Sequence, residues 1–293
     1  MRMTCRGIIA MALAIAPAAF ADEAKPAKTD FTELATPPRY AEAVSLAMDW
    51  GHSLWLDDEA SATATDILTA RHLLQGHEHA TGWITTPYDD KGTWRTFFTE
   101  DDHGTPKDFV DILIDMSSGK ARPVGIDVHS PSIDLTREER LLVDARDRAM
   151  KEPGQRCTER YNQATWLVHH PGGWYVMVDL MPARTQVDAY PVGGFHTYNY
   201  GRLDKGTPLH FQQTNACLNA TRPRDADVQG IWVQHLTGPT PTKFHVFMSL
   251  SFGQTLYVVT ASNKLLWRVD HGTIRLLDSS KGQAHDLVSQ FSD

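Results

Sequence analysis

The sequence predicts an α+β protein, with N-terminal helices packed on a largely antiparallel β-sheet and a β-rich C-terminal half. Three observations predict this class. Apolar residues follow a helical period between Tyr40 and Leu74, β-rich runs separated by turn residues dominate from Gly82 onward, and the connections between the later runs are too short for parallel crossovers. The 293 residues allow one large domain or two closely packed ones.

Residues 1–21 have the pattern of a cleaved secretory signal. Arg2 and Arg6 precede an apolar run from Gly7 to Phe20, which is too short to span a bilayer. Ala19 and Ala21 then supply the small residues that a signal peptidase reads. We therefore expect an exported protein that is periplasmic or, alternatively, extracellular, and no later segment has the ~18 consecutive apolar residues of a transmembrane helix.

The charge of the chain argues against nucleic acid as a partner. The full chain holds 28 Lys and Arg against 36 Asp and Glu, a formal charge of −8, and removal of residues 1–21 makes this −10 because two arginines are lost. Such a surface repels phosphate backbones, and no run of basic residues forms a local patch. The expected partner is an envelope protein or a small ligand, and no motif indicates a cofactor.

The first elements of the exported chain are a leader and two helices. Residues 22–38 are rich in Ala, Lys, Pro and Thr without apolar periodicity, which predicts a flexible leader. The unit 39–134 begins with a helical stripe from Tyr40 to Leu54. A second helix is expected to begin at the acidic residues that follow Leu56 and to end at Gly76, since carboxylates favour a helix N-terminus.

Strands follow the two helices. Residues 83–86 and 93–98 flank Asp89-Asp90-Lys91-Gly92, a turn signal, and predict a hairpin. A third strand is expected over residues 109–116 and a linker over residues 127–134.

The second unit, residues 135–293, is expected to be a separate domain or continuous with 39–134. Thr136 and Glu139 fit a capping box, and the helix that follows should bury Leu142, Ala145 and Ala149. Strands are expected over 165–169, 174–180, 194–200, 208–212, 231–236, 244–249, 255–260, 265–269 and 273–277.

The cysteines predict one disulfide. Cys5 is lost with the signal, which leaves Cys157 and Cys217 in an oxidising compartment. Their bond would close a loop of about 60 residues and stabilise the fold by roughly 4 kcal/mol in the chain-entropy treatment. Two separate buried thiols are the alternative, and no histidine is fixed beside Cys157 to make it a nucleophile.

Most motifs that carry chemistry are absent. There is no phosphate-binding loop, nucleophile elbow, Cys-x-x-Cys pair or calcium loop. His77-Glu78-His79 is similar to the start of a zinc protease motif, but Thr81 stands where the second helical ligand is needed. We expect an exposed loop there and no metal site, the alternative being chelation by His77 and His79 from one side of a strand.

The segment around His196 is the candidate site. His196, Tyr198 and Tyr200 share one face of a predicted strand, and Gly193-Gly194 before them allow a backbone or ligand to approach closely. One interpretation is an aromatic ladder on a half-buried sheet. The other is a catalytic His196 with Tyr198, Tyr200, His210 and His245 as binding residues, in a sheet that could also bring His235 close.

Several segments resemble a group of exported proteobacterial proteins of uncharacterised function. They are Cys157, Tyr161-Asn162, Gly173-Trp174-Tyr175-Val176, Val192-Gly193-Gly194-Phe195-His196, Cys217-Leu218 and Pro241 to Leu250. The resemblance implies a signal peptide, a paired cysteine and a β-rich second half. Phe195 stands where the Gly-Gly-His version has a histidine, which shifts His196 by one position and weakens a catalytic role carried over from that motif.

Two classes of function follow from the sequence. The first is a periplasmic binding or interaction module of unknown ligand, which agrees with the lack of a catalytic motif and with the acidic surface. The second is a cell-envelope hydrolase with a histidine-centred site around His196 on the C-terminal sheet.

Overall fold

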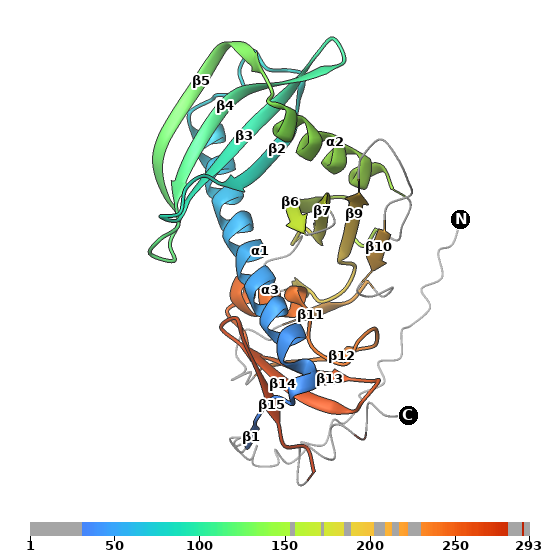
Figure 1. The fold of residues 1–293 in the computed structure, drawn as a ribbon. Coiled ribbons are helices and arrows are strands. Elements are labelled where there is room, and N and C mark those ends of the chain that lie inside the picture. The colour runs from blue at the N-terminus through green and yellow to red at the C-terminus, as the bar shows by residue number, and fades with distance from the viewer. Residues whose placement is uncertain are drawn as a thin grey trace, which may run out of the picture. The chain divides into compact units, whose positions relative to one another are not determined.

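The α+β class predicted from the sequence is confirmed by the computed structural model (Figure 1). The structure describes residues 31–152, 156–170, 173–184, 189–201, 209–212, 217–221, 230–280 and 289. Residues Thr32–Asp293 belong to one compact unit. The predicted signal peptide, residues 1–21, lies outside the described residues, and so does most of the expected leader.

A single 33-residue helix, α1 (Pro38–Ala70), takes the place of the two helices expected from the sequence. Its buried positions follow the helical period along the whole helix, and they are Val44, Ala47, Gly51, Leu54, Asp57, the adjacent Ala60 and Ser61, Ala64 and Leu68. The acidic residues that were expected to begin a second helix therefore lie within one helix, whose buried face continues on both sides of them. α1 packs on α3 (Lys243–Phe252) at Gly51, where a Cβ atom would lie 2.4 Å from Val246 Cβ.

The first sheet is an antiparallel meander in the order β2-β3-β4-β5. Its strands are β2 (Ala80–Pro87), β3 (Thr93–Asp102), β4 (Thr105–Asp115) and β5 (Arg122–Asp134). The hairpin and the third strand are thus confirmed. Residues 127–134, expected to be a linker, instead belong to β5, where Asp127 pairs with Asp111. β5 is an edge strand with mostly exposed side chains, so it tolerates Pro123 and Pro131.

The second sheet has the order β10-β9-β7-β6, with antiparallel neighbours. Its strands are β6 (Tyr161–His170), β7 (Gly173–Pro182), β9 (His196–Gly201) and β10 (Leu209–Gln212). The helix α2 (Arg137–Lys151) packs on β6 and β7, and its predicted capping box is present. A small sheet joins β8 (Ala189–Pro191) to β11 (Asn219–Thr221), and the predicted Cys157–Cys217 disulfide is formed.

The last sheet has the order β1-β15-β14-β13-β12. Its strands are β1 (Glu33–Leu34), β12 (Ile231–His235), β13 (Leu256–Thr260), β14 (Leu265–Asp270) and β15 (Thr273–Leu277). β1 lies within the segment expected to be a flexible leader, but it pairs with β15. Two further expectations are wrong, because residues 244–249 form part of α3 and not a strand, and β12 pairs parallel with β13 through α3 as the crossover.

A mostly apolar and buried segment explains the error at α3, since periodicity does not separate a buried strand from a buried helix. The signals for a helix lie at its ends. The Thr242 N–H donates to His245 Nδ1 at 3.0 Å, and Gly253 ends the helix in the left-handed conformation with φ 58°.

Among the helices of the described residues, none combines the length and the apolar character needed to cross a membrane.

Candidate functional site

The predicted face of His196, Tyr198 and Tyr200 exists, and it is buried. The three side chains are 0%, 1% and 2% exposed, and neighbouring rings stack with centroids 6.1 and 6.4 Å apart. The guanidinium of Arg148, from α2, covers the Tyr200 ring at 4.8 Å. These residues form an aromatic ladder beneath α2, and a ligand from solvent would reach His196 only if its cover moved.

The other predicted histidines lie in two strands of different sheets and in one helix. His210 lies in β10 with Tyr198 as its register partner, and its side chain is outside the described set. His235 at the end of β12 meets His245 of α3, with ring centroids 5.1 Å apart. Burial lowers the pKa of His235 to about 4, and burial together with the His235 charge lowers the pKa of His245 well below its usual value. Both imidazoles are therefore neutral at neutral pH.

Another group of charges lies inside the protein. Asp57 is 0% exposed, and burial, followed by the charges of Asp58 and Asp179, raises its pKa well above the usual value. Asp179 binds Lys243 Nζ at 2.7 Å and accepts a hydrogen bond from Thr197 at 2.6 Å. None of these residues lines the three cavities described next, so we assign them to the core.

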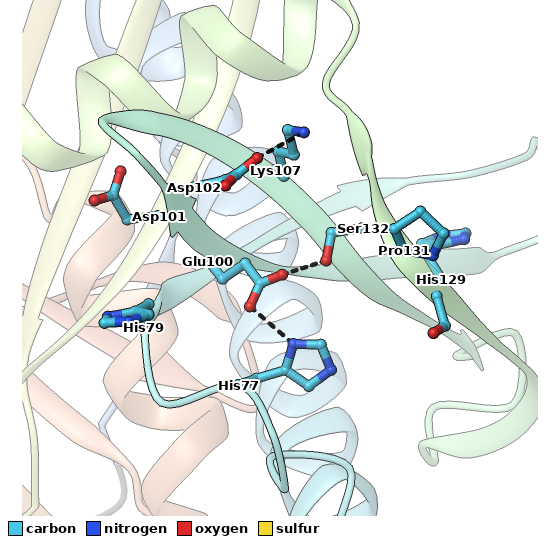
Figure 2. A pocket seen from close by; sticks show the side chains of 10 residues that line it. His77, His79, Glu100, Asp101, Asp102, Lys107, His129, Pro131 and Ser132 are labelled. Carbon is cyan, nitrogen blue, oxygen red and sulfur yellow. Dashed lines mark hydrogen bonds and ion pairs between the residues drawn. The ribbon is translucent and has the colours of Figure 1, made fainter.

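The first cavity, which we call the histidine pocket, has a volume of about 350 Å³ (Figure 2). It is lined by His77 and His79 ahead of β2, residues 100–102 of β3, Lys107 of β4 and residues 129–132 of β5. His77 and His79 lie in a turn segment, which is the loop expected from the sequence. His79 is exposed, whereas His77 is partly buried.

His77 is held in a defined orientation within the histidine pocket. Its Nδ1 lies 2.8 Å from Glu100 Oε2, and its ring stacks on Phe109 with centroids 4.2 Å apart. Figure 2 shows Glu100 between His77 and Ser132, whose hydroxyl donates to the other carboxylate oxygen. Burial raises the pKa of Glu100, but the hydrogen bonds from Ser132 and His77 outweigh it, and the pKa lies below its usual value. The ionised Glu100 favours the His77 tautomer with a proton on Nδ1, which leaves Nε2 as an acceptor.

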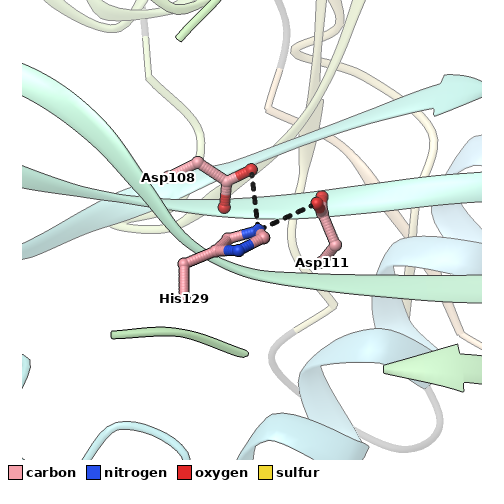
Figure 3. A group of neighbouring side chains, drawn as sticks. All are labelled: Asp108, Asp111 and His129. Carbon is pink, nitrogen blue, oxygen red and sulfur yellow. Dashed lines mark hydrogen bonds and ion pairs between the residues drawn. The ribbon is translucent and has the colours of Figure 1, made fainter. Parts of the chain in front are cut away.

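A charged cluster lies next to this pocket. It consists of Asp108 and Asp111 of β4, His129 of β5, Arg95 of β3 and Glu139 of α2. Arg95 forms ion pairs with all three carboxylates, and His129 Nε2 lies 3.1 Å from Asp111 Oδ2 and 3.9 Å from Asp108 Oδ2 (Figure 3). Burial, with a smaller contribution from Asp111, raises the pKa of Asp108 to about 7 against the opposing effect of Arg95.

Geometry alone would allow the charged cluster to bind a metal ion, because Asp108, Asp111 and His129 offer ligand atoms within 4.8 Å of one another. However, Arg95 Nη2 lies 2.9 Å from Asp108 Oδ2, the oxygen that His129 also approaches. The guanidinium thus already holds the place of a cation. We describe the cluster as an ion-pair network and not as a metal centre.

The second cavity, which we call the tryptophan pocket, has a volume of about 400 Å³. It is lined by Trp50 of α1, Thr86 and Pro87 of β2, Arg95 and Phe97 of β3, Thr136, Glu138, Glu139 and Leu142 near the start of α2, and residues 165–167 of β6. A third cavity of about 140 Å³ shares Glu138 and Leu167 with it, so the space continues beside β6.

The charged cluster connects the two larger pockets. Arg95 lines the tryptophan pocket, His129 lines the histidine pocket, and both bind Asp111. The sequence reasoning missed these residues. A signal was present, since Asp108 precedes and Asp111 interrupts the apolar residues of β4, and carboxylates within a buried strand usually have charged partners.

No family model, curated protein or solved structure matches this chain. The function therefore has to be inferred from the side chains of the pockets themselves.

Proposed function

We propose that this protein is an exported, periplasmic binding protein that takes a small ligand into the tryptophan pocket. One observation carries the proposal: a cavity of about 400 Å³ combines the walls of Trp50, Trp166 and Leu167 with the fixed charges of Arg95 and Glu139. Apolar walls with a few oriented polar groups are typical of small-molecule sites. The ion pair of Arg95 with Glu139 holds the polar side of the pocket in place before a ligand arrives.

Export is supported by the signal-like residues 1–21 and by the Cys157–Cys217 bond, which suits an oxidising compartment. Fractionation of cells that express the full chain shows whether the protein stays in the periplasm or is secreted into the medium. Retention of the uncleaved chain in the cytoplasm would contradict this part of the proposal.

A cavity-filling variant tests the binding site. Thr86→Phe places a ring in the tryptophan pocket at a half-buried position of β2, whereas Thr105→Phe introduces the same ring at an exposed position of β4. We expect a thermal-shift screen of small molecules to find ligands that stabilise the wild type and Thr105→Phe but not Thr86→Phe. Ligands that stabilise Thr86→Phe equally would place the site elsewhere.

The second candidate is a hydrolase, and one observation favours it. His77, with Nδ1 held 2.8 Å from Glu100 and Nε2 left as an acceptor, has the arrangement of a general base. The candidate for a catalytic histidine is therefore His77 in the histidine pocket, in place of the buried His196. Hydrolysis of p-nitrophenyl esters by the wild type, lost in His77→Ala and Glu100→Ala but kept in His79→Ala, would support this activity over simple binding.

A further inference from the structure

We propose that the tryptophan pocket binds a small organic cation, an ammonium group carried on a compact apolar body. This inference rests on the proposed binding function and names the ligand class for the same pocket. It is carried by the charge balance of the pocket and by its aromatic walls.

Carboxylates outnumber basic groups at the pocket. Arg95 is the basic residue among the described side chains that line it, and its guanidinium is shared by Asp108, Asp111 and Glu139. An anionic ligand would have to displace one of these carboxylates from Arg95 and would still face the remaining negative charge. A cation meets no such cost.

Glu138 is the carboxylate available to a ligand. It lines the pocket, its side chain is exposed, and it forms no ion pair within the described part of the chain. Glu139, in contrast, already binds Arg95 and accepts the Thr136 N–H at 2.7 Å. The positive end of α2 contributes roughly half a charge here, and the two glutamates of its first turn outweigh it.

The apolar walls suit a weakly hydrated cation. Trp50 and Trp166 meet edge to face, with centroids 5.8 Å apart and planes at 75°. Tryptophan is the strongest cation–π partner among the aromatic side chains. The pocket already contains one such contact, because the Arg95 guanidinium lies 4.8 Å from the centre of the Phe97 ring.

Three probes of one shape and different charge test the inference on the folded, exported chain. They are choline, its neutral analogue 3,3-dimethylbutan-1-ol, and the anion 3,3-dimethylbutanoate, each titrated by isothermal calorimetry. We expect choline to bind about tenfold more tightly than the alcohol, and the anion to bind more weakly than both. Equal binding of choline and the alcohol, or preferred binding of the anion, would overturn the inference.

Glu138→Gln locates the charge effect. We expect it to weaken choline about threefold to fivefold and to leave the alcohol unchanged, since one exposed carboxylate contributes about 1 kcal/mol at most, which corresponds to about fivefold. Glu42→Gln, an exposed position of α1 that does not line the pocket, is the matched control and should bind choline as the wild type does. An unchanged choline affinity in Glu138→Gln would contradict the role of that carboxylate.

The two proposals fail in different ways. If none of the three probes binds but other small molecules stabilise the wild type and not Thr86→Phe, the pocket binds ligands and the cation inference is wrong. If no molecule distinguishes Thr86→Phe from Thr105→Phe, the binding function itself is wrong.

Discussion

His77 and His129 line a pocket in the first half of the chain, whereas His196, His235 and His245 lie in the core of the second half. The first two side chains are 21% and 12% exposed, and the other three residues are between 0% and 3% exposed. The second half was the more promising place for a histidine site when only the sequence was read. The difference shows that a histidine is available for chemistry only where its surroundings leave one ring nitrogen accessible, and strand composition does not reveal this.

The largest expected effect of this difference is on stability. His245→Ala removes the acceptor of the Thr242 N–H at the start of α3 and leaves a cavity, so the free energy of unfolding should fall by about 2–4 kcal/mol. His79→Ala removes an exposed ring and should change it by less than about 0.5 kcal/mol. Urea unfolding followed by tryptophan fluorescence measures both variants. Equal losses would break the comparison between core and pocket histidines.

A second effect concerns acid. The folded pKa of His235 is lowered to about 4, so the unfolded chain binds more protons than the folded chain between about pH 4 and pH 6.5, and this residue makes stability fall as the pH falls through that range. His235→Asn cannot be protonated there. We expect the wild type to lose roughly 1–3 kcal/mol relative to this variant between about pH 7 and pH 4.5.

Comparison with the variant is needed because buried carboxylates act in the opposite direction. The pKa of Asp58 is about 6 and that of Asp108 is about 7, so both make stability fall as the pH rises through the same range. Both carboxylates are present in the wild type and in His235→Asn, so their contribution cancels in the difference between the two free energies of unfolding. If the difference between the two proteins does not change with pH, His235 is not held neutral by burial.

The sequence predicted the fold well where the signals are local. The hairpin at β2 and β3 has a turn sequence, and the capping box marks the start of α2. The sequence failed at Asp57, which was expected to begin a helix because carboxylates favour a helix N-terminus, and at α3, where a mostly apolar segment fits a helix or a strand.

The site could be predicted far less well than the fold, because its residues are brought together by strand register. Arg95, Asp111 and His129 come from three different strands and meet only when the sheet has formed. A shift of one residue in the register of β4 would turn Asp111 to the other face of the sheet. The carboxylates inside an apolar strand were visible in the sequence, but their partners were not.

The third prediction tests a buried acid against the buried histidines. Asp57 is fully buried, its two oxygens have no hydrogen-bond partner in the described regions, and its raised pKa means that its stabilising contribution is lost as the pH rises through the folded pKa. Asp57→Asn cannot ionise, and we expect its free energy of unfolding to rise by about 1 kcal/mol relative to that of the wild type as the pH increases from acid to alkaline. Asp66→Asn, at an exposed position of α1, is the control and should follow the wild type. If the free energies of unfolding of all three proteins change with pH in parallel, Asp57 does not change its protonation when the protein unfolds.

The smallest expected effect is on the tautomer of His77. Glu100→Ala removes the carboxylate that lies 2.8 Å from Nδ1, so the population with a proton on Nε2 should rise, whereas Asp101→Ala removes an exposed neighbouring carboxylate and should leave the tautomer unchanged. Nitrogen NMR of the imidazole distinguishes the two forms directly. The free energy of unfolding should change by less than about 1 kcal/mol in either variant, because both carboxylates are near the surface. If His77 keeps its proton on Nδ1 without Glu100, the stacking on Phe109 is what orients the ring, and the hydrolase alternative loses the residue that would prepare His77 as a base.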